Sequence, residues 1–187
     1  MNALDGMNYA PKGKPEPVVK EGEFYFAAMY LDHGHINGMC NGLTEAGASL
    51  KYVYDTDRAR AEAFAAKYPG AVVADREETV LNDPSVKLVA AAAITSKRCE
   101  VKETGKKYMV YYSERLHVES AVYAGNLIKQ GAIGRVLNVM GLGPHRIGSP
   151  ENRPAWFFEK ESYGGILCDI GSHQIEQYLY FADVKSA

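Results

Sequence analysis

Between Phe24 and Ile94, short apolar runs alternate with segments that have the hydrophobic spacing of a helix. The apolar runs span 24–30, 50–54, 71–74 and 86–94, and the helical segments span 36–43, 57–67 and 77–82. Short, nearly continuous apolar runs are typical of strands covered on both faces. Because strands that alternate with helices at this pitch form a parallel sheet, residues 24–95 are predicted to have an α/β fold, a Rossmann-like doubly wound parallel sheet.

The pattern changes after Ser96. The runs 108–112 and 136–142 predict two further strands, and 118–130 and 166–181 predict amphipathic helices. Only twelve residues separate Thr95 from the run at 108–112, which is close to the shortest crossover between parallel strands. The predicted domains are an N-terminal arm (1–22), a Rossmann-like dinucleotide-binding domain (23–115), and a linker helix with the start of an α/β substrate domain (116–187).

Charge and cysteine content exclude several classes of function. The formal net charge is −2 and no basic stripe is present, so nucleic acid and anionic membranes are not expected as partners. Cys40, Cys99 and Cys168 are widely spaced and form no CxxC pair, which argues for reduced thiols rather than a zinc ribbon. No apolar stretch reaches the ~18 residues of a membrane span, and no signal-peptide pattern opens the chain. We therefore expect a cytoplasmic protein.

The turn after the first apolar run is the first candidate site. A dinucleotide pyrophosphate needs free backbone N–H groups and glycines at such a turn, yet Gly34 is the only glycine in LDHGH. Asp55 ends the second run 21 positions after Gly34, where an acid that binds the ribose belongs. Polar residues at strand ends are also common in any doubly wound domain. The predicted cofactor-binding residues are Asp32, His33, Gly34, His35, Asp55 and Thr95.

The same turn allows a metal site as an alternative. His33 and His35 form an HxH pair that could bind zinc, and Asp32 is the only further ligand nearby. A zinc site needs three or four ligands, so a polar turn at the mouth of the sheet is favoured. No metal is predicted, and a metal-dependent hydrolase that uses these three residues is the weakest alternative.

Asp169 and His173 form the second candidate site. They lie four positions apart on a predicted helix, so both should project from one face. A carboxylate beside an imidazole can fix its tautomer and raise its basicity, as a proton acceptor for a substrate hydroxyl requires. The alternative is a stabilising pair on a solvated helix face. Both residues are predicted to be catalytic.

Four further residues are predicted to contact a substrate. Arg115 and His117 follow the predicted strand 108–112, and open α/β sheets bind ligands at the carboxyl ends of their strands. Arg153 and Trp156 could line a sugar-sized pocket together with Tyr163, because aromatic faces and polar donors suit polyols.

Several segments resemble the Gfo/Idh/MocA oxidoreductases over residues 24–182. The segments are LDHGH, VYDTDRARAEAFAAKYP, NDPSVKLVAAAAI, the stretch from YMVYY to GLGPHR, and YGGILCDIGSHQIEQYLYF; GAIGRV and GGILCDIGSH are the most specific. The resemblance implies a Rossmann domain followed by an open antiparallel α/β domain, and oxidation of sugars, cyclitols or similar polyols with NAD or NADP. Asp169 and His173 match the family's D-x-x-x-H pair, which works beside a lysine from an E-K-P-type motif.

The chain departs from the family pattern in three ways. It contains no E-K-P-like tripeptide, which implies an internal gap of roughly thirty residues near residue 100. Tyr30 stands where the first fingerprint glycine is expected, and its Cβ should crowd the tight turn. The sequence stops after the first helix of the substrate domain. We therefore expect either a piece of a longer enzyme or a truncated product.

These observations predict an NAD(P)-dependent oxidoreductase that acts on a sugar, cyclitol or similar polyol. The alternative is a catalytically inactive Rossmann-like binding or assembly module. Asp55 favours NAD, while Arg58 leaves room for the 2′-phosphate of NADP. A homo-oligomer is expected, because the apolar face of the helix 166–181 has little to pack on within the chain.

Overall fold

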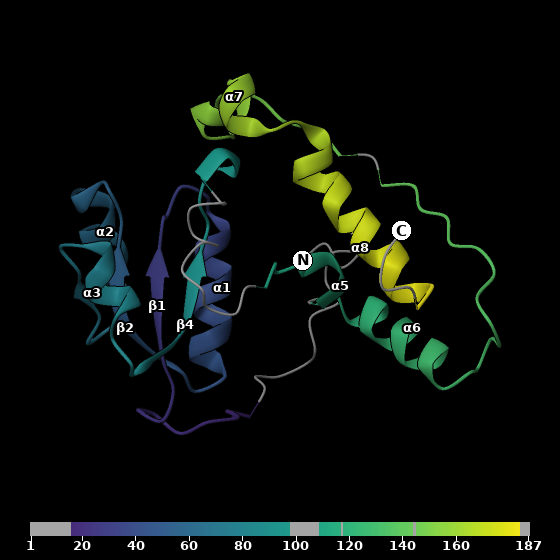
Figure 1. Ribbon diagram of the computed structural model, residues 1–187, viewed down its shortest axis with the longest axis horizontal. Coiled ribbons are helices and arrows are strands. Elements are labelled where there is room, and N and C mark those ends of the chain that lie inside the picture. Colours follow the sequence, from purple (N-terminus) through teal and green to yellow (C-terminus); the bar gives the residue numbers. More distant parts are fainter. Residues whose placement is uncertain (1–15, 98–108, 117, 144, 184–187) are drawn as a thin grey trace, which may run out of the picture. The chain divides into compact units, whose positions relative to one another are not determined.

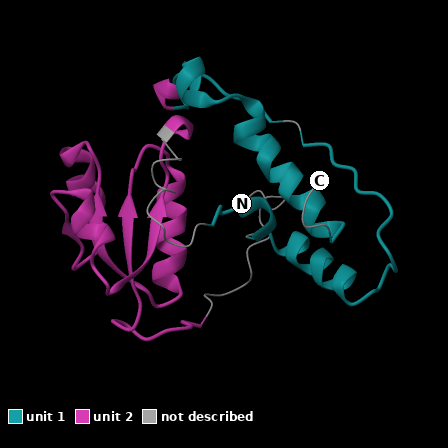
Figure 2. Ribbon diagram, in the orientation of Figure 1, with its two compact units in different colours: residues 1–13, 107–153, 157–187 teal, residues 14–106, 154–156 magenta. Residues whose placement is uncertain are grey.

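The computed structural model describes residues 16–97, 109–116, 118–143 and 145–183. The chain divides into two compact units, shown in different colours in Figure 2. We call residues 14–106 with 154–156 the sheet unit, and residues 1–13, 107–153 and 157–187 the helical unit. The predicted domain boundaries differ from this division and remain a prediction. Within the described residues, no helix has the length and apolarity needed to cross a membrane.

The sheet unit contains four parallel strands. They are β1 (Tyr25–Met29), β2 (Ser49–Tyr54), β3 (Val72–Val73) and β4 (Val86–Ala91), in the order β3-β2-β1-β4. The central strand β1 pairs with β2 on one side and with β4 on the other, as Figure 1 shows. Since the chain turns back across β1 to reach β4, the sheet is wound in both directions. This confirms the predicted α/β fold with a Rossmann-like parallel sheet.

Side chains on alternate positions of β1 enter two separate cores. Phe26 and Ala28 pack with residues of α1 (His35–Glu45) and α2 (Arg58–Ala65). Ala27 and Met29 face the other way, where they pack with Val80 of α3 (Glu77–Leu81). These four of the five β1 side chains are at most 1% exposed. Helices therefore cover both faces of the sheet, which explains why β1 reads as a continuous apolar run.

The predicted ends of these elements are close to the observed ones. Asp57 caps α2 as expected, because its carboxylate accepts a hydrogen bond from the backbone N–H of Arg60 (3.2 Å). The helix ends at Ala65 rather than Lys67, since the N–H of Lys67 bonds three residues back to the carbonyl of Phe64. Residues 64–67 therefore form a turn with the three-residue spacing of a 3₁₀-helix, rather than the α-helical turn that the apolar spacing predicted.

Gly47, two residues after the end of α1, is needed for the docking of residues 18 and 19. The N–H groups of Val18 and Val19 both donate to the carbonyl of Ala46, at 2.9 and 3.3 Å. Gly47 has a φ of +97°, and a Cβ at this position would lie 1.9 Å from the carbonyl oxygen of Val19. The residue therefore combines a left-handed backbone with a close backbone contact.

Gly47→Ala is expected to lower the free energy of unfolding by about 2 kcal/mol, because left-handed strain adds to this clash. Gly70→Ala is the matched control: its φ is +87°, but nothing lies within 4 Å of the added Cβ. Its cost should be about 1 kcal/mol. Urea unfolding followed by far-UV circular dichroism measures both, and equal losses would show that the contact with Val19 does not matter.

The helical unit is built from short helices around α8. The elements are α5 (Ser113–Leu116), α6 (Glu119–Lys129), α7 (Lys160–Tyr163), the π-helical turn η3 (Leu167–Gly171) and α8 (Ser172–Phe181). The 3₁₀ turn η2 (Ala155–Phe158) joins the two units in sequence, and η1 (Thr95–Lys97) follows β4 in the sheet unit. α8 contacts both α5 and α6. The predicted helix 166–181 is thus interrupted, because its first part is the wider turn η3.

The two strands predicted after residue 96 are wrong. Residues 109–112 and 136–142 form no strand, and Tyr108 lies outside the described residues. A strand needs a neighbour to bond its N–H and C=O groups, and no described strand of the helical unit lies beside either segment. Leu137, Met140 and Leu142 are 80, 86 and 97% exposed. The predicted self-association remains a prediction, and the predicted gap near residue 100 lies outside the described residues.

Candidate functional site

Tyr30 begins the loop that follows β1. Its φ is +53°, so it adopts the left-handed conformation that a glycine takes more easily, at a cost of ~1–2 kcal/mol. Its N–H donates to the carbonyl of Tyr54 and its own carbonyl accepts from Ala92, both at 3.1 Å. Its hydroxyl donates to Glu77 of α3 (2.6 Å). The expected crowding is therefore avoided, because the backbone takes the glycine conformation and the side chain packs toward α3.

Two N–H groups in the first turn of α1 are bonded within the loop. Nδ1 of His33 accepts from the N–H of His35 (3.1 Å), and the carbonyl of His33 accepts from Ile36 (3.2 Å). Gly34 has an ordinary helical φ of −58°, and nothing lies within 4 Å of a Cβ built on it. The amides of His35 and Ile36 are thus engaged within the loop, and no close contact requires a glycine at Gly34.

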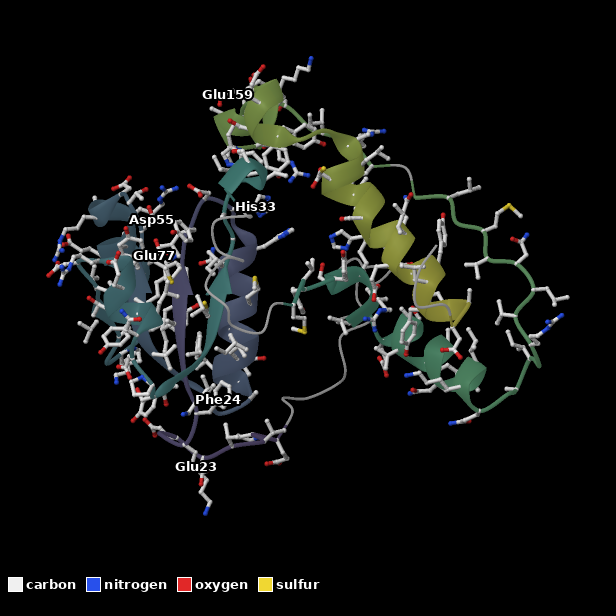
Figure 3. All side chains as sticks on the ribbon, in the orientation of Figure 1. Glu23, Phe24, His33, Asp55, Glu77 and Glu159 are labelled. Atoms are coloured by element: carbon white, nitrogen blue, oxygen red, sulfur yellow. The ribbon has the colours of Figure 1, made fainter. Side chains whose placement is uncertain are left out.

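Asp55 is sealed inside the loop. Its side chain is 1% exposed, although it lies at the carboxyl end of β2 as predicted (Figure 3). Oδ2 accepts from the N–H of Leu31 (2.7 Å), and Oδ1 accepts from the N–H of Asp57 (2.8 Å). Nη2 of Arg60 donates to the same Oδ1 (2.9 Å). Asp55 as placed here does not fit the predicted role of ribose acceptor.

Arg60 joins two carboxylates of this edge. Its Nη1 donates to Oδ1 of Asp32 (3.1 Å) and its Nη2 to Asp55, so one guanidinium bridges the ends of β1 and β2. Oδ2 of Asp32 also accepts from the N–H of Ile94 (3.3 Å), beyond the end of β4. Asp32 therefore fixes the loop between neighbouring strands, and its negative charge is compensated by Arg60.

Trp156, which was predicted to contact a substrate, is placed at the same loop. It belongs to the sheet unit, where its Nε1 donates to the carbonyl of Asp32 (3.3 Å). Its ring lies 6.2 Å from that of His33, edge to face. Thr95 begins η1 in the same unit and is half-buried. Trp156 thus lies beside Asp32 and His33, two of the predicted cofactor-binding residues, and no sequence pattern indicated this contact.

An open groove of about 230 Å³ lies between α1 and α2, and we call it the α1–α2 groove. Leu31, Ile36, Ala63 and Phe64 line its apolar part, and the other lining residues are His33, Gly34, Asn37, Arg60 and Lys67. Its two charged side chains are both cationic, and no carboxylate is among the lining residues. Nε of Arg60 is buried and has no hydrogen-bond partner. This groove was not predicted from the sequence, because Lys67 lies beyond the end of α2 and only the fold brings it to the same groove as Arg60.

The metal alternative finds no support at this edge. Within the described residues, no three His, Cys, Asp or Glu side chains are grouped to hold a metal ion. The carboxylate of Asp32 is engaged by Arg60 and by the N–H of Ile94, rather than being available beside His33 and His35.

In the helical unit, Asp169 bonds to Tyr163 instead of His173. Oδ2 of Asp169 accepts from the hydroxyl of Tyr163 (3.1 Å), and burial together with this carboxylate raises the pKa of Tyr163. The ring of Tyr163 lies 5.3 Å from that of Phe157, over which the guanidinium of Arg153 stacks at 4.8 Å. Arg153 also donates to the carbonyl of Ile147 (3.1 Å). Arg153 and Asp169 are thus brought to one aromatic cluster.

The predicted orientation of His173 by Asp169 is wrong in this structure. Nδ1 of His173 is buried and has no hydrogen-bond partner, and the ring packs edge-on against Tyr112 at 5.4 Å. Asp169 lies in the π-helical turn η3 and His173 lies on α8, so the spacing of an α-helix does not hold between them.

Arg115 has a structural partner. It forms an ion pair with Glu176 of α8, and its guanidinium lies 4.2 Å from the ring centre of Tyr180. These contacts join α5 to α8. Arg115 was predicted to follow a strand at 108–112, but residues 109–112 form no strand. His117, the other residue predicted there, lies outside the described residues.

A second open cavity, of about 250 Å³, lies along α8 and was not predicted. Its polar side chains are Glu114, His145, Gln174, Gln177 and Tyr178. Gln177 donates to Glu114 (3.2 Å), and Gln174 donates to the carbonyl of Gly143 (3.0 Å). A Cβ on Gly143 would lie 2.3 Å from Nε2 of Gln174, so the amide of Gln174 would have to shift to make room for it. This mixture of donors and acceptors suits a ligand rich in hydroxyl groups.

Comparison with known proteins gives a consistent family assignment. Residues 122–187 match the family described as GFO/IDH/MocA C-terminal domain. A solved structure from Erwinia carotovora atroseptica, assigned as an oxidoreductase, is 40% identical, with a TM-score of 0.74 over 86% of this chain and 57% of that one. Levoglucosan dehydrogenase, complexed with NADH and levoglucosan, is 20% identical (TM-score 0.65; 84% of this chain, 53% of that one).

A super-repressor mutant of Gal80p from Saccharomyces cerevisiae is 13% identical (TM-score 0.64; 86% of this chain, 53% of that one). Likeness at this level, as for levoglucosan dehydrogenase, shows the fold alone. The chain spans little more than half the length of these three proteins. No curated protein sequence matches it significantly.

Proposed function

Because this chain belongs to the Gfo/Idh/MocA family, we propose that it serves an NAD(P)-dependent oxidoreductase that acts on a sugar, cyclitol or similar polyol. The observation that carries the proposal is the 40% identity, over most of this chain, to a protein assigned as an oxidoreductase. A related fold binds NADH together with levoglucosan, which supports both the cofactor class and the substrate class.

The proposed roles of this chain's residues follow from their surroundings. The cavity along α8 offers a carboxylate, an imidazole, two amides and a phenol to the hydroxyl groups of a polyol. His173 has a buried ring nitrogen without a partner, which can take the proton of a substrate hydroxyl. Asp169 has an indirect role: its carboxylate accepts a hydrogen bond from the hydroxyl of Tyr163 and so fixes the position of that hydroxyl. A bound nicotinamide would accept the hydride.

Nucleotide binding is the first test of this proposal. Trp156 is the only tryptophan, and it contacts the loop after β1. We expect titration with NADH or NADPH to quench tryptophan fluorescence and to give energy transfer to the nicotinamide. Trp156→Phe is the control: it should remove the quenching signal and leave binding detectable by calorimetry. If neither nucleotide binds by either method, the proposed function is wrong.

One observation favours the alternative of a catalytically inactive binding module. The carboxylate predicted to bind the ribose is fully engaged by Leu31, Asp57 and Arg60.

A panel of sugars and inositols, assayed for NAD(P)H production, separates the two proposals. Nucleotide binding without turnover on any member of the panel would favour the inactive module.

A further inference from the structure

We propose that the cavity along α8 binds an amino-substituted sugar or polyol, whose ammonium group is held by the carboxylate of Glu114. The inference rests on the proposed function and deepens it, since it names the substrate class that this cavity selects among sugars and polyols. A neutral sugar and a sugar acid should both bind more weakly than the corresponding amino sugar.

The charge of the cavity favours a cation. Glu114 is the only Asp, Glu, Lys or Arg among the described residues that line it, so one carboxylate sets its formal charge. The neighbouring cation, Arg115, does not line the cavity, and its guanidinium is paired with Glu176 instead. Within the described lining, no lysine or arginine is thus placed to bind the carboxylate or phosphate of an acidic sugar.

Two side chains of α8 direct their hydrogen-bond donors to the backbone that lines the same cavity. The amide nitrogen of Gln174 donates to the carbonyl of Gly143 (3.0 Å), and the hydroxyl of Tyr178 donates to the carbonyl of Gly141 (3.3 Å). The only hydrogen of the Tyr178 hydroxyl is therefore used within the protein, and so is one of the two amide hydrogens of Gln174. Both side chains keep an oxygen that can accept a hydrogen bond from a ligand.

Glu114 is held in place and keeps an oxygen for a ligand. Its Oε2 accepts from the amide nitrogen of Gln177 on α8 (3.2 Å), and Gln177 is its only hydrogen-bond partner among the described residues. An ammonium group has three donors and no acceptor, so it matches a carboxylate that is surrounded by amide and phenol oxygens. A sugar hydroxyl carries no charge and donates one hydrogen, so it gains less from the same oxygens.

Calorimetry with glucosamine, glucose and glucuronate tests the inference, because the three probes share one ring and differ in charge. At about pH 7, where the amine is protonated, we expect glucosamine to bind about tenfold more tightly than glucose, since one charge-assisted hydrogen bond accounts for that factor. Glucuronate should bind more weakly than glucose, because its carboxylate is repelled by that of Glu114. Added salt should reduce the advantage of glucosamine over glucose.

Glu114→Gln removes the charge but keeps the side-chain shape and an acceptor for Gln177. In this variant the affinities for glucosamine and glucose should become nearly equal. Glu119→Gln is the matched control, because Glu119 is an exposed carboxylate in the first turn of α6 that does not line the cavity. It should retain the preference for glucosamine, and far-UV circular dichroism checks that both variants are folded.

The other outcomes overturn different parts of the inference. If glucose or glucuronate binds as tightly as glucosamine, the cavity does not select an amine, while the proposed function stands. A preference for glucosamine that persists in Glu114→Gln would also overturn the inference, because the selectivity would then arise elsewhere. If none of the three sugars binds, nor an inosamine or its parent inositol, the inference and the proposed substrate class both fail.

Discussion

Replacement of His173 with alanine is expected to lower kcat/KM for polyol oxidation by about 10²- to 10⁴-fold, the usual contribution of a positioned proton acceptor. The imidazole is packed edge-on against Tyr112, and its Nδ1 is buried without a partner. Buried polar atoms without a hydrogen-bond partner are uncommon in proteins, because each of them lowers the free energy of unfolding. A role in the reaction would account for it.

The measurement is NAD(P)H production with a panel of sugars and inositols, which gives kcat and KM separately. A loss in kcat with little change in KM would mark a group that acts in the transition state rather than in substrate binding. Ile175→Ala is the control on the same helix, since its side chain is 52% exposed and takes no part in the proposed site. A loss of less than about tenfold in His173→Ala would contradict the assignment.

The sheet unit could be predicted well because its signals are local. The central strand β1 is buried on both faces, so its composition reports its environment directly. The segment 136–142 has an equally apolar composition, yet it forms no strand, since pairing requires a second strand that local sequence does not specify. The same distinction explains why α2 and its cap at Asp57 were predicted and η3 was not.

The candidate site was harder to predict than the fold. The sequence placed Asp55 correctly at the end of a strand, but its burial depends on Arg60 and on the N–H of Leu31, which only the folded loop brings to it. Asp169 and His173 looked paired because an α-helix was assumed through both. Contacts between distant segments decided these cases, as they did for Trp156 and Asp32, which are far apart in sequence.

Asp55→Ala is expected to lower the free energy of unfolding of the sheet unit by about 3 kcal/mol. The substitution leaves the amides of Leu31 and Asp57 without their acceptor and removes one of the two carboxylates of Arg60. Arg60 itself can turn toward solvent, because 38% of its side chain is exposed, so the lower part of the range for a broken buried ion pair applies.

Urea unfolding, followed by Trp156 fluorescence and far-UV circular dichroism, measures this loss. Asp75→Ala is the matched control, since that carboxylate pairs with Arg58 but is 79% exposed, and its removal should cost at most about 1 kcal/mol. Asp55→Asn retains one acceptor oxygen and removes the charge, so its loss should fall between the two. If Asp55→Ala unfolded as easily as Asp75→Ala, the carboxylate would not be sealed in solution. Asp55 would then be free to meet a ribose, as its place at the end of β2 predicts.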